Sequence, residues 1–66
     1  MIIRVNGESK ETAQDLSVAQ FIKEMALDEN RIVIELNASV LPKQEFSRTT
    51  LQDGDRLELV EFVAGG

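Results

Sequence analysis

The residues best suited to do chemistry are the last seven, Val60 to Gly66, in which a β-rich segment runs into Ala-Gly-Gly and a free carboxylate. Two glycines in this position arise by chance with a probability of roughly 0.5%, at a glycine usage of about 7% per position. Chain ends are also where sequence varies with little consequence. The terminus alone therefore leaves two interpretations open, a frayed end and a reactive carboxylate.

The composition removes most catalytic chemistry from the rest of the chain. Its 66 residues include no cysteine and no histidine, which excludes the commonest nucleophile–base pairs and the usual transition-metal ligands. A domain of this size buries only about 60% of its unfolded surface, so it has little interior in which to shift a carboxyl or lysine pKa toward neutrality. We therefore expect no enzyme, no catalytic residue, no metal and no bound cofactor.

Charge and hydropathy favour protein partners. The net charge is −5, from 12 acidic and 7 basic side chains, and this excess repels nucleic acid and anionic membrane surfaces while it attracts basic protein surfaces. No apolar run approaches the length of a membrane span. The first residues, Met1 to Val5, lack the features of a signal peptide. The expected compartment is the cytoplasm.

The N-terminal part of the chain predicts a β-hairpin followed by one helix. Residues 1–5 alternate with a period of two, and Asn6-Gly7 is typical of a type I′ turn, which needs positive φ at both central residues. The charged segment 8–12 is typical of an edge strand. A capping box, Ser17 with Gln20, then starts an amphipathic helix of about ten residues. We expect it to end near 28–30, with Asn30 as a left-handed C-cap; its apolar stripe comprises Val18, Phe21, Ile22, Met25 and Ala26.

The remaining sequence predicts three further strands, at 32–36, 39–41 and 56–63. Residues 43–50 are typical of a loop with one short helical turn. Asp53-Gly54-Asp55 indicates a turn rather than a calcium loop, because the further oxygen ligands and the later bidentate glutamate are missing.

Three apolar residues are expected on the outer side of the sheet. Val60 and Phe62 fall on the face of the last strand opposite Leu57 and Leu59, and Val33 lies outward on the strand predicted at 32–36. Exposed apolar patches rimmed by charge often mark docking surfaces. We call Val33, Val60 and Phe62 the docking face and predict that a partner protein binds there.

The order of elements predicts the architecture. A helix and a sheet that each have one apolar side must cover one another. The right-handed crossover rule then places the last strand beside the first and parallel to it. The expected fold is α+β, a β-grasp (ubiquitin-like) mixed sheet of four to five strands packed on one helix. It forms a single domain, 1–66, with a flexible C-terminal tail, 64–66.

Four short motifs occur in a distinctive order along the whole chain: Met-x-Ile-x-Val-Asn-Gly at 1–7, Asn-x-x-Val-x-Pro-Lys at 37–43, Asp-Gly-Asp at 53–55 and Ala-Gly-Gly at 64–66. In this order they resemble the sulfur carrier protein of thiamine biosynthesis. One departure from the family pattern is Asn37-Ala38, where a residue more tolerant of a tight turn would be expected.

The resemblance implies a function for the terminus. In that family an adenylating activating enzyme uses ATP on the C-terminal carboxylate, sulfur from a desulfurase system replaces the adenylate, and the resulting thiocarboxylate donates sulfur to thiazole synthase. Carried over, Gly66 would be the modified residue, and Gly65 and Ala64 the segment that enters partner active sites. The residues suit this role, because the terminal carboxylate is ionised at neutral pH and glycines keep the tail narrow.

Three alternatives stay open. The small subunit of molybdopterin synthase also ends in Val-Ala-Gly-Gly but usually has prolines where this chain has Glu61-Phe62. A ubiquitin-like modifier that attaches to lysines is a second alternative. A β-grasp protein-binding module with an inert tail is the third, and under that hypothesis Gly66 is never modified.

Overall fold

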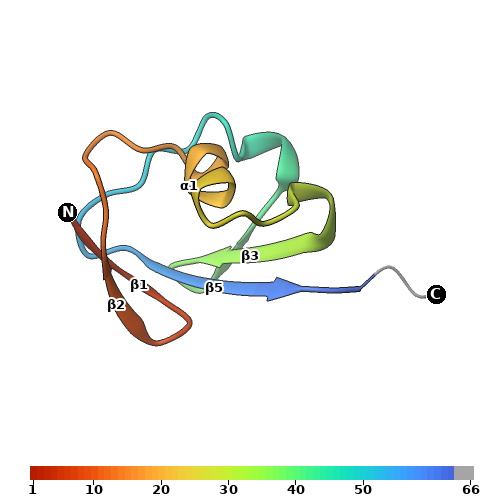
Figure 1. Cartoon of the computed structure of the whole chain (residues 1–66), viewed down its shortest axis with the longest axis horizontal. Helices are drawn as coiled ribbons and strands as arrows, with labels where there is room; N and C mark the ends of the chain where they lie inside the picture. Colours follow the sequence, from red (N-terminus) through yellow and green to blue (C-terminus); the bar gives the residue numbers. More distant parts are fainter. Residues whose placement is uncertain (64–66) are drawn as a thin grey trace.

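The computed structural model describes residues 1–63, and within them a mixed sheet carries one α-helix across one face (Figure 1). The strands run in the spatial order β2-β1-β5-β3-β4, with β1 and β5 parallel and the other neighbours antiparallel. This arrangement confirms the α+β, β-grasp prediction. The predicted flexible tail, 64–66, lies outside the described residues. The strands are β1 (Ile2–Val5), β2 (Glu8–Glu11), β3 (Ile32–Leu36), β4 (Ser39–Leu41) and β5 (Arg56–Glu61).

Two-residue turns close both hairpins. Asn6 and Gly7 have φ of 50° and 84°, which confirms the turn predicted between β1 and β2. Asn37 and Ala38, between β3 and β4, have φ of 51° and 71°. Positive φ brings a Cβ close to the backbone, so Ala38 is strained where the sequence departs from the family pattern.

The helix α1 (Val18–Glu24) begins at the predicted capping box. The Gln20 N–H donates to Ser17 Oγ at 3.1 Å, and the Ser17 N–H donates to Gln20 Oε1 at 2.9 Å. Two further N–H groups of the first turn, those of Val18 and Ala19, donate to backbone carbonyls of the loop before β5. The first turn therefore has hydrogen-bond partners beyond its own capping box.

The end of the helix differs from the prediction. α1 stops at Glu24, and Ala26 takes the left-handed position with φ 58°. The N–H of Ala26 donates to the Lys23 carbonyl and that of Leu27 to the Ile22 carbonyl, both at 3.0 Å, which is a Schellman motif. This early end brings Leu27 back against the core while Ala26 is exposed. Asn30 is not the cap; it lies in a 3₁₀ turn, η1 (Glu29–Arg31).

The core fills the space between α1 and the inner side of the sheet. The predicted short helical turn is present as η2 (Lys43–Glu45), and Phe46 behind it is 2% exposed. The Asp-Gly-Asp segment is a turn, as predicted, in which Asp53 Oδ1 accepts from the Ile2 N–H at 2.7 Å. β5 ends at Glu61 rather than at Val63. The buried residues are Ile3, Val5, Leu16, Val18, Phe21, Ile22, Ile32, Ile34, Phe46, Leu51 and Leu57.

Candidate functional site

The strand that leads to the C-terminus is the centre of the sheet. β5 pairs with β1 on one side and with β3 on the other, and it ends on the side of the molecule opposite the N-terminus (Figure 1). Bonding to the β3 side continues beyond the strand, because the Phe62 N–H donates to the Arg31 carbonyl at 2.9 Å. The described chain is therefore anchored by backbone hydrogen bonds up to the residue before Val63.

Two asparagines from the hairpin turns bind β5 from opposite sides. The Leu59 N–H donates to Asn6 Oδ1 at 2.7 Å, and Asn6 Nδ2 donates to the Leu59 carbonyl at 3.3 Å; we call this pair of bonds the Asn6 bridge. At the start of β5, the Arg56 N–H donates to Asn37 Oδ1 at 2.9 Å. Sequence analysis assigned these asparagines to turns alone. Their second role follows from contacts between segments far apart in the chain, for which the sequence has no local signal.

The structure brings the predicted docking face together. Val33 and Val60 are directly opposite each other in the β3–β5 register, and Phe62 follows two residues after Val60. Their exposed fractions are 46%, 63% and 49%. Exposure at this level is compatible with docking, because the side chains are available to a partner, but it does not test the docking prediction itself.

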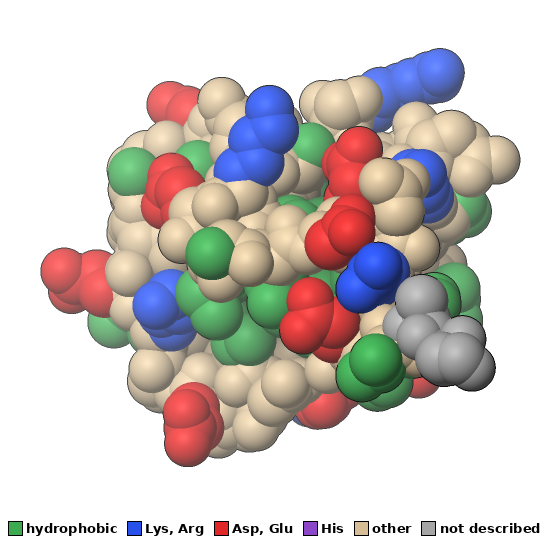
Figure 2. Space-filling view, turned by 45° about the vertical axis from the view of Figure 1, so that its right-hand side comes forward, with side chains coloured by type: hydrophobic (Ala, Val, Ile, Leu, Met, Phe, Trp, Pro, Cys, Tyr) green, Lys and Arg blue, Asp and Glu red, His purple; other side chains and the backbone are tan. Residues whose placement is uncertain are grey.

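A pair of acidic residues adjoins the docking face, and sequence analysis missed it. Glu35 and Glu58 are exposed and directly opposite each other, two register positions from Val33 and Val60 and on the same face of the sheet. Like charges in this position destabilise a sheet. The ion pair found among residues 1–63 joins Arg31 to Asp28. Within this range, therefore, neither Glu35 nor Glu58 forms a salt bridge with a basic side chain. Figure 2, which turns the right-hand side of Figure 1 toward the reader, shows charged and apolar side chains intermixed on the face in view.

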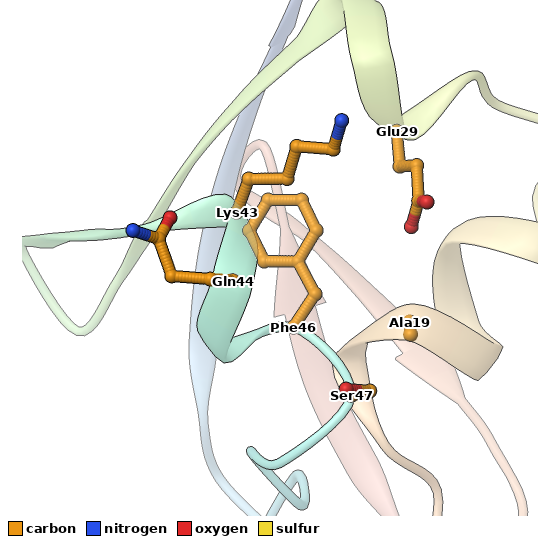
Figure 3. A pocket seen from close by; sticks show the side chains of 6 residues that line it. All are labelled: Ala19, Glu29, Lys43, Gln44, Phe46 and Ser47. Carbon is orange, nitrogen blue, oxygen red and sulfur yellow. The ribbon is translucent and has the colours of Figure 1, made fainter.

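A shallow pocket lies on the helix side of the sheet, between α1, η1 and η2 (Figure 3). Its volume is about 300 Å³, and its apolar lining includes Phe46, a core residue. The Lys43 ammonium at its rim donates to Asn30 Oδ1. We assign this pocket no role in the chemistry of the terminus.

Residues 1–63 contain no group of three or more carboxylates placed to hold a metal ion. No helix in the same range is long and apolar enough to cross a membrane. Ala64, Gly65 and Gly66, the predicted reactive segment, lie outside the described residues, so their roles stay predictions.

A mixed sheet that grasps one helix, with its central strand leading to Ala-Gly-Gly, defines a ubiquitin-like protein of the β-grasp class. The model of the ThiS family matches residues 3–66. The chain therefore belongs to the ThiS family.

Individual relatives agree with this assignment. The chain is 32% identical over 66 residues to the sulfur carrier protein ThiS of Bacillus subtilis, covering 98% of this chain and 100% of that protein. It is 30% identical to a thiazole synthase of Paramagnetospirillum magneticum, of which it spans only 20%. The crystal structure of the thiamine biosynthesis protein ThiS of Geobacter metallireducens superposes with a TM-score of 0.85 at 32% identity, over 100% of both chains. These matches confirm the resemblance seen in the motifs.

Proposed function

We propose that this chain carries sulfur for the thiazole moiety of thiamine, and that the carboxylate of Gly66 is the group that carries it. The observation that supports this most directly is the family match, which extends through Gly66. It coincides with a terminus whose preceding strand is paired on both sides. The chain is then a substrate of partner enzymes, and the relatives named sulfur carriers agree with this role.

The chemistry divides between the chain and its partners. A carboxylate oxygen of Gly66 attacks the α-phosphorus of ATP in an adenylating enzyme, and pyrophosphate leaves. Sulfur from a desulfurase system then attacks the acyl carbon, and AMP leaves with the bonding electron pair. Where that sulfur arrives as a persulfide, a thiol of the partner reduces the S–S bond, becomes part of a disulfide and releases the thiocarboxylate. Activation comes first because an ionised carboxylate is a poor acyl acceptor. ATP belongs to the activating enzyme, and we expect no cofactor site on the chain itself. We place the reaction in the cytoplasm.

Thiazole synthase is the proposed acceptor of the sulfur. The relative from Paramagnetospirillum magneticum bears that name and contains a stretch similar to this chain within a much longer protein. A carrier and its acceptor gain effective concentration when they share one polypeptide. We propose that this chain delivers its sulfur by docking on thiazole synthase.

The docking face is the proposed contact with the activating enzyme. Val33, Val60 and Phe62 are exposed apolar side chains beside the segment that must enter the active site. Extended, residues 64–66 reach about 10 Å at ~3.4 Å per residue, which suits a tail that enters a pocket while Phe62 rests at its mouth. The Glu35–Glu58 pair adds negative charge that a basic rim on the partner would neutralise.

Intact mass tests the proposal. The chain isolated from thiamine-starved cells should include a species in which one oxygen at the C-terminus is replaced by sulfur. A variant that lacks Gly66 should show no such species and should fail to support growth without thiamine. An unmodified wild-type chain, together with normal growth of the truncated variant, would instead favour a binding module with an inert tail.

A further inference from the structure

The β1–β5 pair ends in an arrangement that the chemistry above does not explain. In the parallel register Val5 lies opposite Leu57, and the chain turns out of the sheet at Asn6, whose N–H donates to the Leu57 carbonyl at 2.9 Å. The next groups of β5 on this edge are the N–H and the carbonyl of Leu59. β1 has no further residue that could pair with these two groups. The side chain of Asn6 bonds to both of them instead, through the Asn6 bridge.

Asparagine is well suited to this place. Its amide offers one carbonyl acceptor and an NH₂ donor, the same pair of groups as a peptide unit. It also tolerates the left-handed backbone that the turn requires, here φ 50°. Glycine would satisfy the turn without bonding to Leu59, and aspartate would provide the acceptor alone.

With the Asn6 bridge, the end of β5 is hydrogen-bonded along both of its edges. On the β3 side, Val60 lies opposite Val33 and the Phe62 N–H donates to the Arg31 carbonyl at 2.9 Å. On the β1 side, the Asn6 bridge at Leu59 is the last bond among the described residues. Without it, the final residues of β5 would be bonded along one edge only.

We propose that Asn6 is a positioning residue for the carrier reaction, whose side chain fixes the direction in which β5 presents the docking face and the C-terminal segment. The proposal rests on the proposed function of Gly66. Reaction of a carboxylate in a partner's site needs near-attack geometry, which is reached more readily from a rigid base. Residues that are already ordered in the free chain add no further ordering cost to the free energy of binding.

The variant Asn6→Gly keeps the turn and removes both bonds of the bridge. Hydrogen exchange at the Leu59 amide should accelerate about tenfold, the equivalent of about 1.4 kcal/mol, within the range of one or two net hydrogen bonds. The Phe62 amide, which does not contact Asn6, should also exchange faster. Pyrophosphate release can be measured with the activating enzyme and excess ATP. The KM for the variant chain should rise about tenfold and kcat should stay unchanged, because the end of β5, less ordered in the free variant, becomes ordered when it binds.

Asn37→Gly is the matched control. Asn37 occupies the equivalent turn position with φ 51°, and its side chain accepts from the Arg56 N–H at the start of β5, far along the strand from the terminus. This variant loses the same kind of bond and should lower thermal stability similarly, yet leave the KM and the Phe62 exchange rate unchanged. Asn6→Asp retains the acceptor for the Leu59 N–H. It should therefore protect that amide from exchange and have a KM close to that of the wild-type chain.

The outcomes separate the two proposals. Equal rises in KM for Asn6→Gly and Asn37→Gly would show a general loss of stability and overturn the positioning role. An unchanged Phe62 exchange rate in Asn6→Gly would overturn it as well, and this measurement needs no partner enzyme. Failure of the wild-type chain to release pyrophosphate with its activating enzyme would overturn the proposed function instead, and the exchange rates would still report on the bridge.

Discussion

Phe62 shows at the level of a single residue how exposure and position combine. It follows β5 directly, its N–H is fixed to the Arg31 carbonyl, and its side chain is 49% exposed. A half-exposed aromatic side chain with an anchored backbone offers a large apolar contact with little further ordering, which is the usual character of an interface hot spot. It therefore serves as the sharpest single test of the docking face.

Phe62→Asp should weaken docking and leave the fold intact. We expect the KM for the activating enzyme to rise at least about tenfold, as for loss of a hot spot, and the free energy of unfolding to change by less than about 1 kcal/mol. Ile2→Asp is the control, because Ile2 is 54% exposed and lies at the start of β1, away from the end of β5. Loss of folding in Phe62→Asp would show that the side chain belongs to the core.

At the level of elements, the chain carries strain in two of its connections. Ala26 after α1 and Ala38 between β3 and β4 both have positive φ, at 58° and 71°. Glycine is the usual residue in such positions because it lacks the Cβ that crowds the backbone. The helix end and the hairpin therefore keep their geometry because the surrounding packing and pairing impose it.

Ala26→Gly and Ala38→Gly should each stabilise the protein. Relief of the left-handed alanine should raise the free energy of unfolding by about 1 kcal/mol, or the Tm by about 4–8 °C for a domain of this size. Ala19→Gly, inside α1, should do the reverse by about the same amount, because glycine is unfavourable in a helix interior. Thermal melts of the three variants test this; destabilisation by Ala38→Gly would mean that the turn changes conformation in solution.

At the level of the whole molecule, the net charge is negative, and part of it lies beside the docking face. The chain carries −5 overall, and the Glu35–Glu58 pair concentrates negative charge beside the docking face. Such an arrangement accelerates encounter with a basic partner and matters less for the final affinity. We therefore propose that the basic partner surface expected from the composition binds beside this pair.

Association with the activating enzyme should depend on salt through this pair. Raising the ionic strength to about 1 M, where the Debye length is about 3 Å, should slow association about tenfold and change dissociation little. Glu35→Gln with Glu58→Gln should remove most of this dependence. Glu24→Gln with Glu29→Gln, on the helix side, should retain most of it; equal effects of both double variants in stopped-flow measurements would assign the steering to net charge alone.

Much of the protein could be predicted from local patterns in the sequence. The capping box, the Asn-Gly turn and the alternation of the strands are decided by residues within a few positions of one another. These signals placed α1 at its correct start and the strands at nearly their observed bounds. The lack of cysteine and histidine, together with the final glycines, indicated the terminus as the reactive part of the chain.

Only the tertiary structure decided the features that depend on distant contacts. The helix ends at Glu24 rather than near 28–30 because Leu27 packs against the core. Asn6 reaches Leu59, 53 residues away, only because β1 and β5 are parallel neighbours in one register. The opposition of Glu35 to Glu58 likewise depends on the pairing of β3 with β5. A local pattern indicates which face a side chain takes, but strand register, set by packing of the whole sheet, decides what it meets there.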